Sequence, residues 1–197
     1  MSTIALFHSV LGVRPGITGA ADRLRAASHD VVIVDQYDGR SFDDYTVASQ
    51  YVDDIGFPVL MEKAMTAVAD LRDDLVVVGF SNGGGMAEYA ATQRPVAGVV
   101  LASGTLPLEM IGADHWPADV PAQIHYTTHD PYREQSWVDS VVATIEAAGV
   151  PLEVYDSYPG SGHLFTDPSL PNEYDPEAAE AFYQRLLAFC RRVTTGS

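Results

Sequence analysis

Short apolar runs alternate along the chain with longer segments whose apolar positions recur at a helical period. Several runs are continuously apolar and rich in β-branched residues, which is typical of strands covered on both faces. The predicted strands are residues 3–8, 31–37, 75–80, 96–103, 122–128 and 152–158. The helical period predicts helices over about residues 16–28, 57–71, 83–92, 134–148 and 176–193.

This alternation of strands and helices predicts the fold class. It favours right-handed crossovers and an α/β fold with a doubly wound, mostly parallel six-stranded sheet flanked by helices. We expect residues 1–197 to form a single domain, because no repeat, low-complexity segment or linker interrupts the pattern. Residues 38–56 are too long for a simple turn, and we expect them to wall a pocket. In such sheets, ligands bind at the carboxyl ends of the strands.

Candidate chemistry appears where the third predicted strand ends. The stretch "GFSNGGG" (residues 79–85) places Ser81 between a strand and a helix, flanked by Gly79 and Gly83. The pattern G-x-S-x-G in this setting indicates a nucleophile elbow, a sharp turn that exposes a serine hydroxyl beside a helix N-terminus. A glycine-rich turn without chemistry is the alternative.

Two further residues separate these alternatives. Asp130 follows the fifth predicted strand, and His163 lies in the glycine-rich "YPGSGHLF" after the sixth. Taken singly, Asp130 could be a turn residue and His163 a packing histidine. All three residues are expected at the same sheet edge, in the chain order serine, acid, histidine of an elbow enzyme. We therefore predict a catalytic triad of Ser81, Asp130 and His163.

Composition and charge exclude some classes of binding partner. The chain has 11 Lys and Arg against 27 Asp and Glu, a formal charge of −16. A field of this sign repels nucleic acid and anionic lipid, so we expect neither nucleic acid nor membrane as a partner. Cys190, the single cysteine, lies at helical spacing from apolar residues, which favours a buried thiol that packs in the core. The chain starts without a basic signal-like segment, and we expect a cytoplasmic protein.

The motifs resemble the dienelactone hydrolase family of α/β-hydrolases. The likeness rests on "GFSNGGG", on Asp130, on "YPGSGHLF" and on the acidic, alanine-rich helix after it, and it spans nearly the whole chain. It implies the minimal α/β-hydrolase fold without a cap domain. It also implies that Ser81 is the nucleophile, His163 the base and Asp130 its orienting acid. The oxyanion hole would consist of the backbone N–H groups of Asn82 and Val10.

This sequence departs from the family members that cleave dienelactone. They carry a cysteine where this chain has Ser81, and a glutamate in the loop where this chain has Ser9. Serine relies on the neighbouring imidazole to accept its proton, so the missing glutamate fits a serine enzyme. Those members also carry an arginine that grips the substrate carboxylate, where this chain has Asp167. We expect a neutral or cationic ester in place of dienelactone.

Several other residues are candidates for substrate contact. We expect His8, Ser9 and Leu11 in the first-strand loop, together with Phe165 after the base, to contact substrate, although a structural histidine fits His8 equally well. Trp116, Trp137 and Tyr132 are further aromatic candidates, with ordinary packing as the alternative. His125 and His129 stand four residues apart on a predicted strand, a spacing that does not focus two metal ligands. We expect no metal and no cofactor.

The sequence thus predicts a serine hydrolase acting on a small ester or lactone through an acyl-enzyme. A thioesterase, an acyltransferase and a non-catalytic ligand-binding protein on a hydrolase scaffold stay open as alternatives. The acyl group, the alcohol and the formation of a homo-oligomer also stay open.

Overall fold

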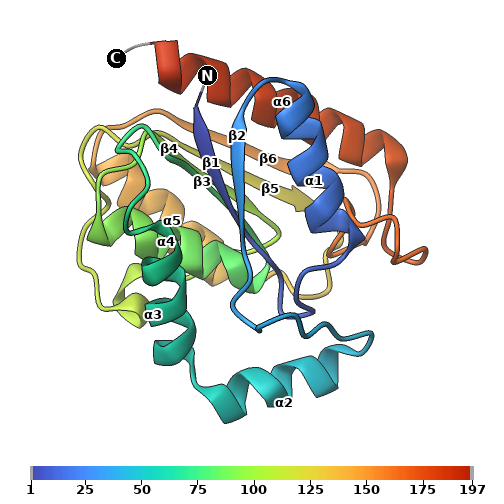
Figure 1. Ribbon diagram of the computed structural model, residues 1–197. Helices are drawn as coiled ribbons and strands as arrows, with labels where there is room; N and C mark the ends of the chain where they lie inside the picture. The colour runs from blue at the N-terminus through green and yellow to red at the C-terminus, as the bar shows by residue number, and fades with distance from the viewer. Residues whose placement is uncertain (1, 196–197) are drawn as a thin grey trace.

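The computed structural model describes residues 2–195 and contains one central sheet of six parallel strands. The strand order is β2-β1-β3-β4-β5-β6, so the chain starts at the strand next to one edge, forms that edge with β2, and then crosses to β3 and continues to the other edge (Figure 1). The strands are β1 (Thr3–Phe7), β2 (Asp30–Val34), β3 (Val76–Phe80), β4 (Gly98–Ala102), β5 (Ala122–Thr127) and β6 (Leu152–Tyr158). The predicted fold class is confirmed, and the sheet is entirely parallel.

Within residues 2–195, six α-helices and a short 3₁₀ helix connect or follow the strands. They are α1 (Pro15–Ala26), α2 (Tyr45–Ile55), α3 (Phe57–Val68), α4 (Asn82–Gln93), η1 (Leu108–Ile111), α5 (Gln135–Ala147) and α6 (Pro176–Thr195). Helices α1 and α6 cover one face of the sheet, and α3, α4 and α5 cover the other (Figure 1). No helix in the described part of the chain is long and apolar enough to span a membrane.

The core follows the alternation of side chains along each strand. In β1, Ile4 and Leu6 pack toward α1 and α6, whereas Ala5 and Phe7 pack toward α3 and α4. Both faces are apolar because both are covered, which explains the unbroken apolar runs of the sequence. Cys190 is fully buried in the α6 layer, as expected.

The segment expected only to wall a pocket contains a helix that the sequence analysis did not predict. Asp44 caps the N-terminus of α2, where its carboxylate accepts a hydrogen bond from the Val47 N–H at 2.9 Å, and Gly56, which has a φ of 86°, caps the C-terminus. Ala48 is the only residue buried within α2. The helix lies beyond the carboxyl edge of the sheet, at the bottom of Figure 1.

Candidate active site

Ser81 occupies the sharp turn between β3 and α4. Its φ of 53° and ψ of −118° lie in a region that residues with a side chain rarely adopt. The turn is closed by glycines: a Cβ on Gly79 would stand 2.1 Å from the Gly83 carbonyl oxygen, and one on Gly83 would stand 2.2 Å from that of Phe7. Only glycine therefore allows β3, α4 and β1 to approach this closely. The turn presents the Ser81 hydroxyl above the carboxyl edge of the sheet.

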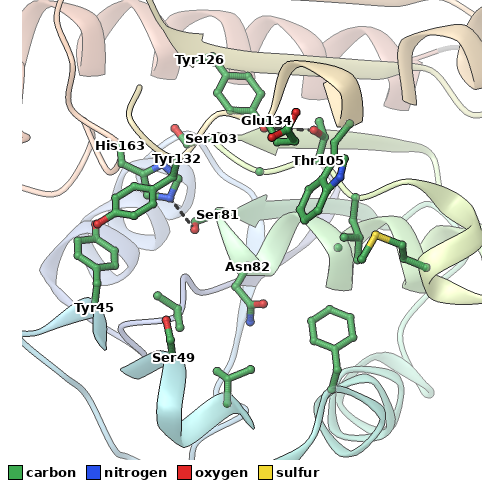
Figure 2. Close-up of a pocket in the computed structure, with 18 of the residues that line it drawn as sticks. Tyr45, Ser49, Ser81, Asn82, Ser103, Thr105, Tyr126, Tyr132, Glu134 and His163 are labelled. Atoms are coloured by element: carbon green, nitrogen blue, oxygen red, sulfur yellow. Dashed lines mark hydrogen bonds between the residues drawn. The ribbon is translucent and has the colours of Figure 1, made fainter. Parts of the chain in front are cut away.

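The three residues predicted as a triad form a continuous hydrogen-bonded chain. The Ser81 hydroxyl lies 2.7 Å from His163 Nε2, and His163 Nδ1 lies 2.9 Å from each carboxylate oxygen of Asp130. With the proton on Nδ1, the ring donates to Asp130 and accepts the serine proton on Nε2. Asp130 Oδ1 also accepts the Tyr132 N–H at 2.9 Å, which fixes the carboxylate. Figure 2 shows the Ser81–His163 contact at the edge of the cavity.

The loop that carries His163 is anchored on both sides. A Cβ on Gly162 would stand 1.9 Å from the Glu173 carbonyl oxygen, and the Gly162 carbonyl accepts the Thr127 hydroxyl at 2.9 Å. The Glu173 carboxylate accepts the Leu164 N–H at 2.8 Å and the Tyr45 hydroxyl at 3.0 Å. Glu173 thus joins the histidine loop to α2. No sequence motif identified this role, which only the packing of two distant segments creates.

A cavity of about 580 Å³ opens beside Ser81. Its lining includes Ser81, His163 and both predicted oxyanion residues, Asn82 and Val10. Asn82 is the first residue of α4, where N–H groups have no partner within the helix. The role of these N–H groups stays a prediction, and both residues line the cavity beside Ser81.

The cavity wall is largely aromatic and apolar. The further lining side chains are Tyr45, Ser49, Val52, Asp53, Phe57, Ser103, Thr105, Leu106, Met110, Tyr126, Tyr132, Glu134 and Trp137. Asp53 and Glu134 are the two carboxylates in the wall, and none of the described lining residues is a lysine or an arginine. Tyr132 and Trp137, two of the aromatic candidates, therefore lie at the cavity. Trp116, the third, is buried elsewhere and donates to the Val120 carbonyl.

The predicted substrate contacts of His8, Ser9, Leu11 and Phe165 are corrected by the structure. All four are buried, and none lines the cavity. His8 holds the backbone instead: Nδ1 donates to the Ser9 carbonyl at 2.7 Å, and Nε2 accepts the Gln36 N–H at 3.1 Å. Burial lowers the pKa of His8, which favours this neutral form. Sequence adjacency to the oxyanion loop was a poor guide because, apart from Val10, the side chains of this loop are buried away from the cavity.

Asp167 also differs from its expected place. It does not line the cavity beside Ser81, and its Oδ1 accepts the Gly16 N–H at 3.0 Å, at the start of α1. Its Oδ2 lies 3.5 Å from Arg14 Nε, and Arg14 in turn donates to the Phe42 carbonyl and the Ser169 hydroxyl. Asp167 therefore holds loops together. The charge of the cavity is set by Asp53 and Glu134.

Glu88 is a buried acid in α4 that the sequence analysis did not single out. Its Oε2 accepts the Leu106 N–H at 2.9 Å, whereas Oε1 is buried without a partner among the described residues. Burial raises the pKa of Glu88 well above its ordinary value, which favours the protonated form. A lone acid in the apolar stretch "GMAEYAA" is the signal that could have drawn attention to it.

His125, considered as a metal ligand in the sequence, is engaged in the core. Its Nδ1 lies 2.9 Å from the Tyr158 hydroxyl, and its Nε2 lies 3.2 Å from Gln123 Oε1. Burial lowers the pKa of His125 to about 3. His129 is exposed on the turn after β5. The two rings therefore do not form a pair of ligands.

Comparisons with known proteins identify the family and agree with the fold. A family model for the dienelactone hydrolase family matches residues 2–194. No curated protein sequence matches the chain. Among solved structures, a dienelactone hydrolase-like promiscuous phosphotriesterase, P91, from metagenomic libraries superposes with a TM-score of 0.79 at 20% identity, covering 98% of this chain and 87% of that one.

Two other similar structures extend the comparison. A dienelactone hydrolase from Anabaena variabilis has a TM-score of 0.69 at 17% identity, with 98% of this chain and 86% of that chain covered. The α/β hydrolase MGS-M1 from a Medee basin deep-sea metagenome has a TM-score of 0.68 at 16% identity, with 98% and 85% covered. At such identities the likeness establishes the fold, and the reaction has to be argued from the site.

Proposed function

The chain belongs to the dienelactone hydrolase family, and we propose that it is a serine hydrolase that cleaves a small ester or lactone through Ser81, His163 and Asp130. The observation that carries the proposal is the hydrogen-bonded chain from the Ser81 hydroxyl through His163 to Asp130 at the cavity. The three hydrogen-bonded residues come from three separate loops at one sheet edge. A glycine-rich turn with a purely structural role does not require this arrangement.

The geometry supports acyl transfer in two steps. Ser81 Oγ attacks the carbonyl carbon while His163 Nε2 accepts its proton, and Asp130 stabilises the imidazolium that forms. The N–H groups of Asn82 and Val10 are suited to donate to the oxyanion at the N-terminus of α4. His163 then protonates the departing alcohol. Water attacks the acyl-enzyme by the same route and releases the acid.

The charge of the wall supports an uncharged or cationic substrate. Asp53 and Glu134 are both exposed at the cavity, with no lysine or arginine among the described lining residues. A carboxylate on the substrate would therefore meet like charges and no cation. We infer that anionic lactones are poor substrates, for this reason and not because of Asp167.

The first test is the turnover of p-nitrophenyl acetate by Ser81→Ala. We expect a loss of at least about 10³-fold with unchanged folding, and a loss of about 10⁴-fold in Asp130→Asn, which keeps the shape of the site. A fluorophosphonate should label the wild type at Ser81, and His163→Ala should not react at a comparable rate. Near wild-type turnover by Ser81→Ala would refute the assignment, and a lack of both turnover and labelling would favour a binding protein.

The second test compares substrates of one acyl length. We expect p-nitrophenyl butyrate to be cleaved at least severalfold faster than p-nitrophenyl hemisuccinate, whose four-carbon acyl group carries a carboxylate. The corresponding thioester, tested in parallel, separates an esterase from a thioesterase. A preference for the hemisuccinate would contradict the inference from Asp53 and Glu134.

A further inference from the structure

A second serine at the cavity, Ser103, shares with Ser81 a positive φ angle that is unusual for a residue other than glycine. Ser103 follows β4 directly, as Ser81 follows β3, and the register of these adjacent strands pairs Phe80 with Ala102. Ser81 and Ser103 are therefore the next residues along two neighbouring strands. Their φ angles are 53° and 56°. The turn after β4 thus shares with the turn after β3 a serine of positive φ directly after the strand.

Backbone strain at Ser103 calls for an explanation. A residue other than glycine in this region costs on the order of 1 kcal/mol or more, and such residues concentrate at functional sites. The strain at Ser81 is explained by the elbow. At position 103 a glycine would follow the same path without strain, so the serine side chain must offer something that glycine lacks.

The hydroxyl of Ser103 is also unsatisfied. Ser103 is 4% exposed, and its Oγ is buried with no hydrogen-bond partner among the described residues. A buried hydroxyl without a partner is unfavourable, so such groups are rare unless they serve a purpose. Ser103 lines the cavity, and Figure 2 shows its hydroxyl on the same side of Ser81 as His163 and Tyr132.

The position beside His163 matters in both half-reactions. The leaving alcohol lies there during acylation, and water replaces it during hydrolysis of the acyl-enzyme. An attacking water gives one proton to His163 Nε2 and directs a lone pair at the acyl carbon. Its second O–H group then needs an acceptor to fix its orientation. Three other hydroxyls of the wall are already engaged: those of Tyr126 and Thr105 with each other at 3.2 Å, and that of Tyr45 with Glu173 at 3.0 Å.

We propose that Ser103 Oγ accepts a hydrogen bond from the water that hydrolyses the acyl-enzyme. The proposal rests on the proposed serine hydrolase activity and adds a catalytic residue to it. The water oxygen bonds to the acyl carbon as one proton passes to His163, while the other proton stays on the oxygen and points at Ser103. The bond from the acyl carbon to Ser81 Oγ then breaks, Ser81 regains its proton from His163, and the free acid leaves.

Methanol provides a selective probe, because it carries only one O–H group. Methanol can give its proton to His163, but it has no second proton to donate to Ser103. Removal of the Ser103 hydroxyl should therefore slow hydrolysis of the acyl-enzyme and leave methanolysis nearly unchanged. A purely structural defect would slow both reactions alike.

The experiment measures product partitioning in water–methanol mixtures with p-nitrophenyl butyrate as substrate. In Ser103→Ala we expect the ratio of methyl butyrate to butyrate to rise about tenfold over wild type, as expected for one hydrogen bond lost in the transition state. An unchanged ratio would overturn the proposal. Because the ratio is taken within one acyl-enzyme, it does not depend on how much of the variant is active.

Ser103→Gly is the matched variant. It also lacks the hydroxyl, but glycine adopts the φ of 56° without strain, so it should be at least as stable as Ser103→Ala. Both variants should show the same rise in partitioning despite different stabilities. A rise confined to Ser103→Ala would assign the effect to strain and refute the proposal. Failure of the proposed function itself looks different: neither product forms from wild type, or Ser81→Ala forms both.

Discussion

The floor and the rim of the cavity are built in different ways. The floor consists of Ser81, Asn82, Ser103 and Gly104, which follow β3 and β4 directly. Their positions are fixed by main-chain contacts: the Ser81 N–H donates to the Ala102 carbonyl, and the Ser103 N–H donates to the His125 carbonyl, both at 2.8 Å. Each floor residue is thus placed by the sheet itself.

The rim consists of Asp53, Met110, Tyr132, Glu134 and Trp137, contributed by α2, η1, α5 and the turn before α5. These residues are exposed, and they lie on helices and turns outside the sheet. The difference indicates a division of labour. Changes in the floor should affect folding and chemistry together, whereas changes in the rim should affect the choice of substrate and little else.

The largest effect is expected for Gly104→Ala in the floor. A Cβ at this position would stand 1.9 Å from the Ser81 carbonyl oxygen, so the elbow or the β4 turn must move. We expect a loss of about 3 kcal/mol in the free energy of unfolding, and loss of ester turnover. Urea denaturation and p-nitrophenyl acetate hydrolysis measure the two effects.

Gly19→Ala is the matched control. Gly19 lies on the exposed side of α1, and a Cβ there meets no atom within 4 Å. Alanine should stabilise the helix by about 0.5–1 kcal/mol and leave turnover unchanged. Equal effects of the two substitutions would show that the floor is not especially constrained.

An intermediate effect is expected at Glu88, which supports the floor from α4. Glu88→Ala removes the acceptor of the Leu106 N–H and should cost about 2–3 kcal/mol, whereas Glu88→Gln keeps an acceptor of the same shape. We expect Glu88→Gln to retain turnover and Glu88→Ala to lose part of it, because Leu106 lines the cavity. Denaturation curves and steady-state kinetics of both variants test this expectation.

The pH dependence of stability provides a second readout at Glu88. Its folded pKa is raised above the ordinary value of 4.5, so between the two values the folded chain holds a proton that the unfolded chain has released. Stability from this group therefore falls as pH rises above about 4.5, by at most about 1.4 kcal/mol per pH unit. The amide of Glu88→Gln does not titrate and so lacks this pH-dependent contribution. The free energy of unfolding of wild type should therefore fall relative to that of Glu88→Gln between pH 5 and pH 8. A constant difference would mean that Glu88 is ionised in the folded protein.

The contrast between the floor and the rim also explains which features could be predicted from the sequence. The sheet and the geometry of Ser81, Asp130 and His163 were predictable because apolar runs mark buried strands and a parallel sheet brings their carboxyl ends together. The rim was not predictable, because Asp53 and Glu134 reach the cavity only through the path of α2 and the start of α5. Glu173 and Asp167 were missed or misplaced for a similar reason: their partners, Tyr45 and Arg14, are far away in the sequence.

The smallest effect is expected at Met110 in the rim. Its side chain is 53% exposed and lines the cavity from η1, so it offers apolar surface to a long acyl chain but little to the core. Met110→Ser should lower kcat/KM for p-nitrophenyl hexanoate about two- to threefold relative to the acetate, since roughly half of a buried methylene's contribution is lost. Its free energy of unfolding should stay within about 0.5 kcal/mol of wild type. A large loss of stability, or an equal loss of activity on both esters, would show that η1 belongs to the floor and that the rim is not an independent determinant of selectivity.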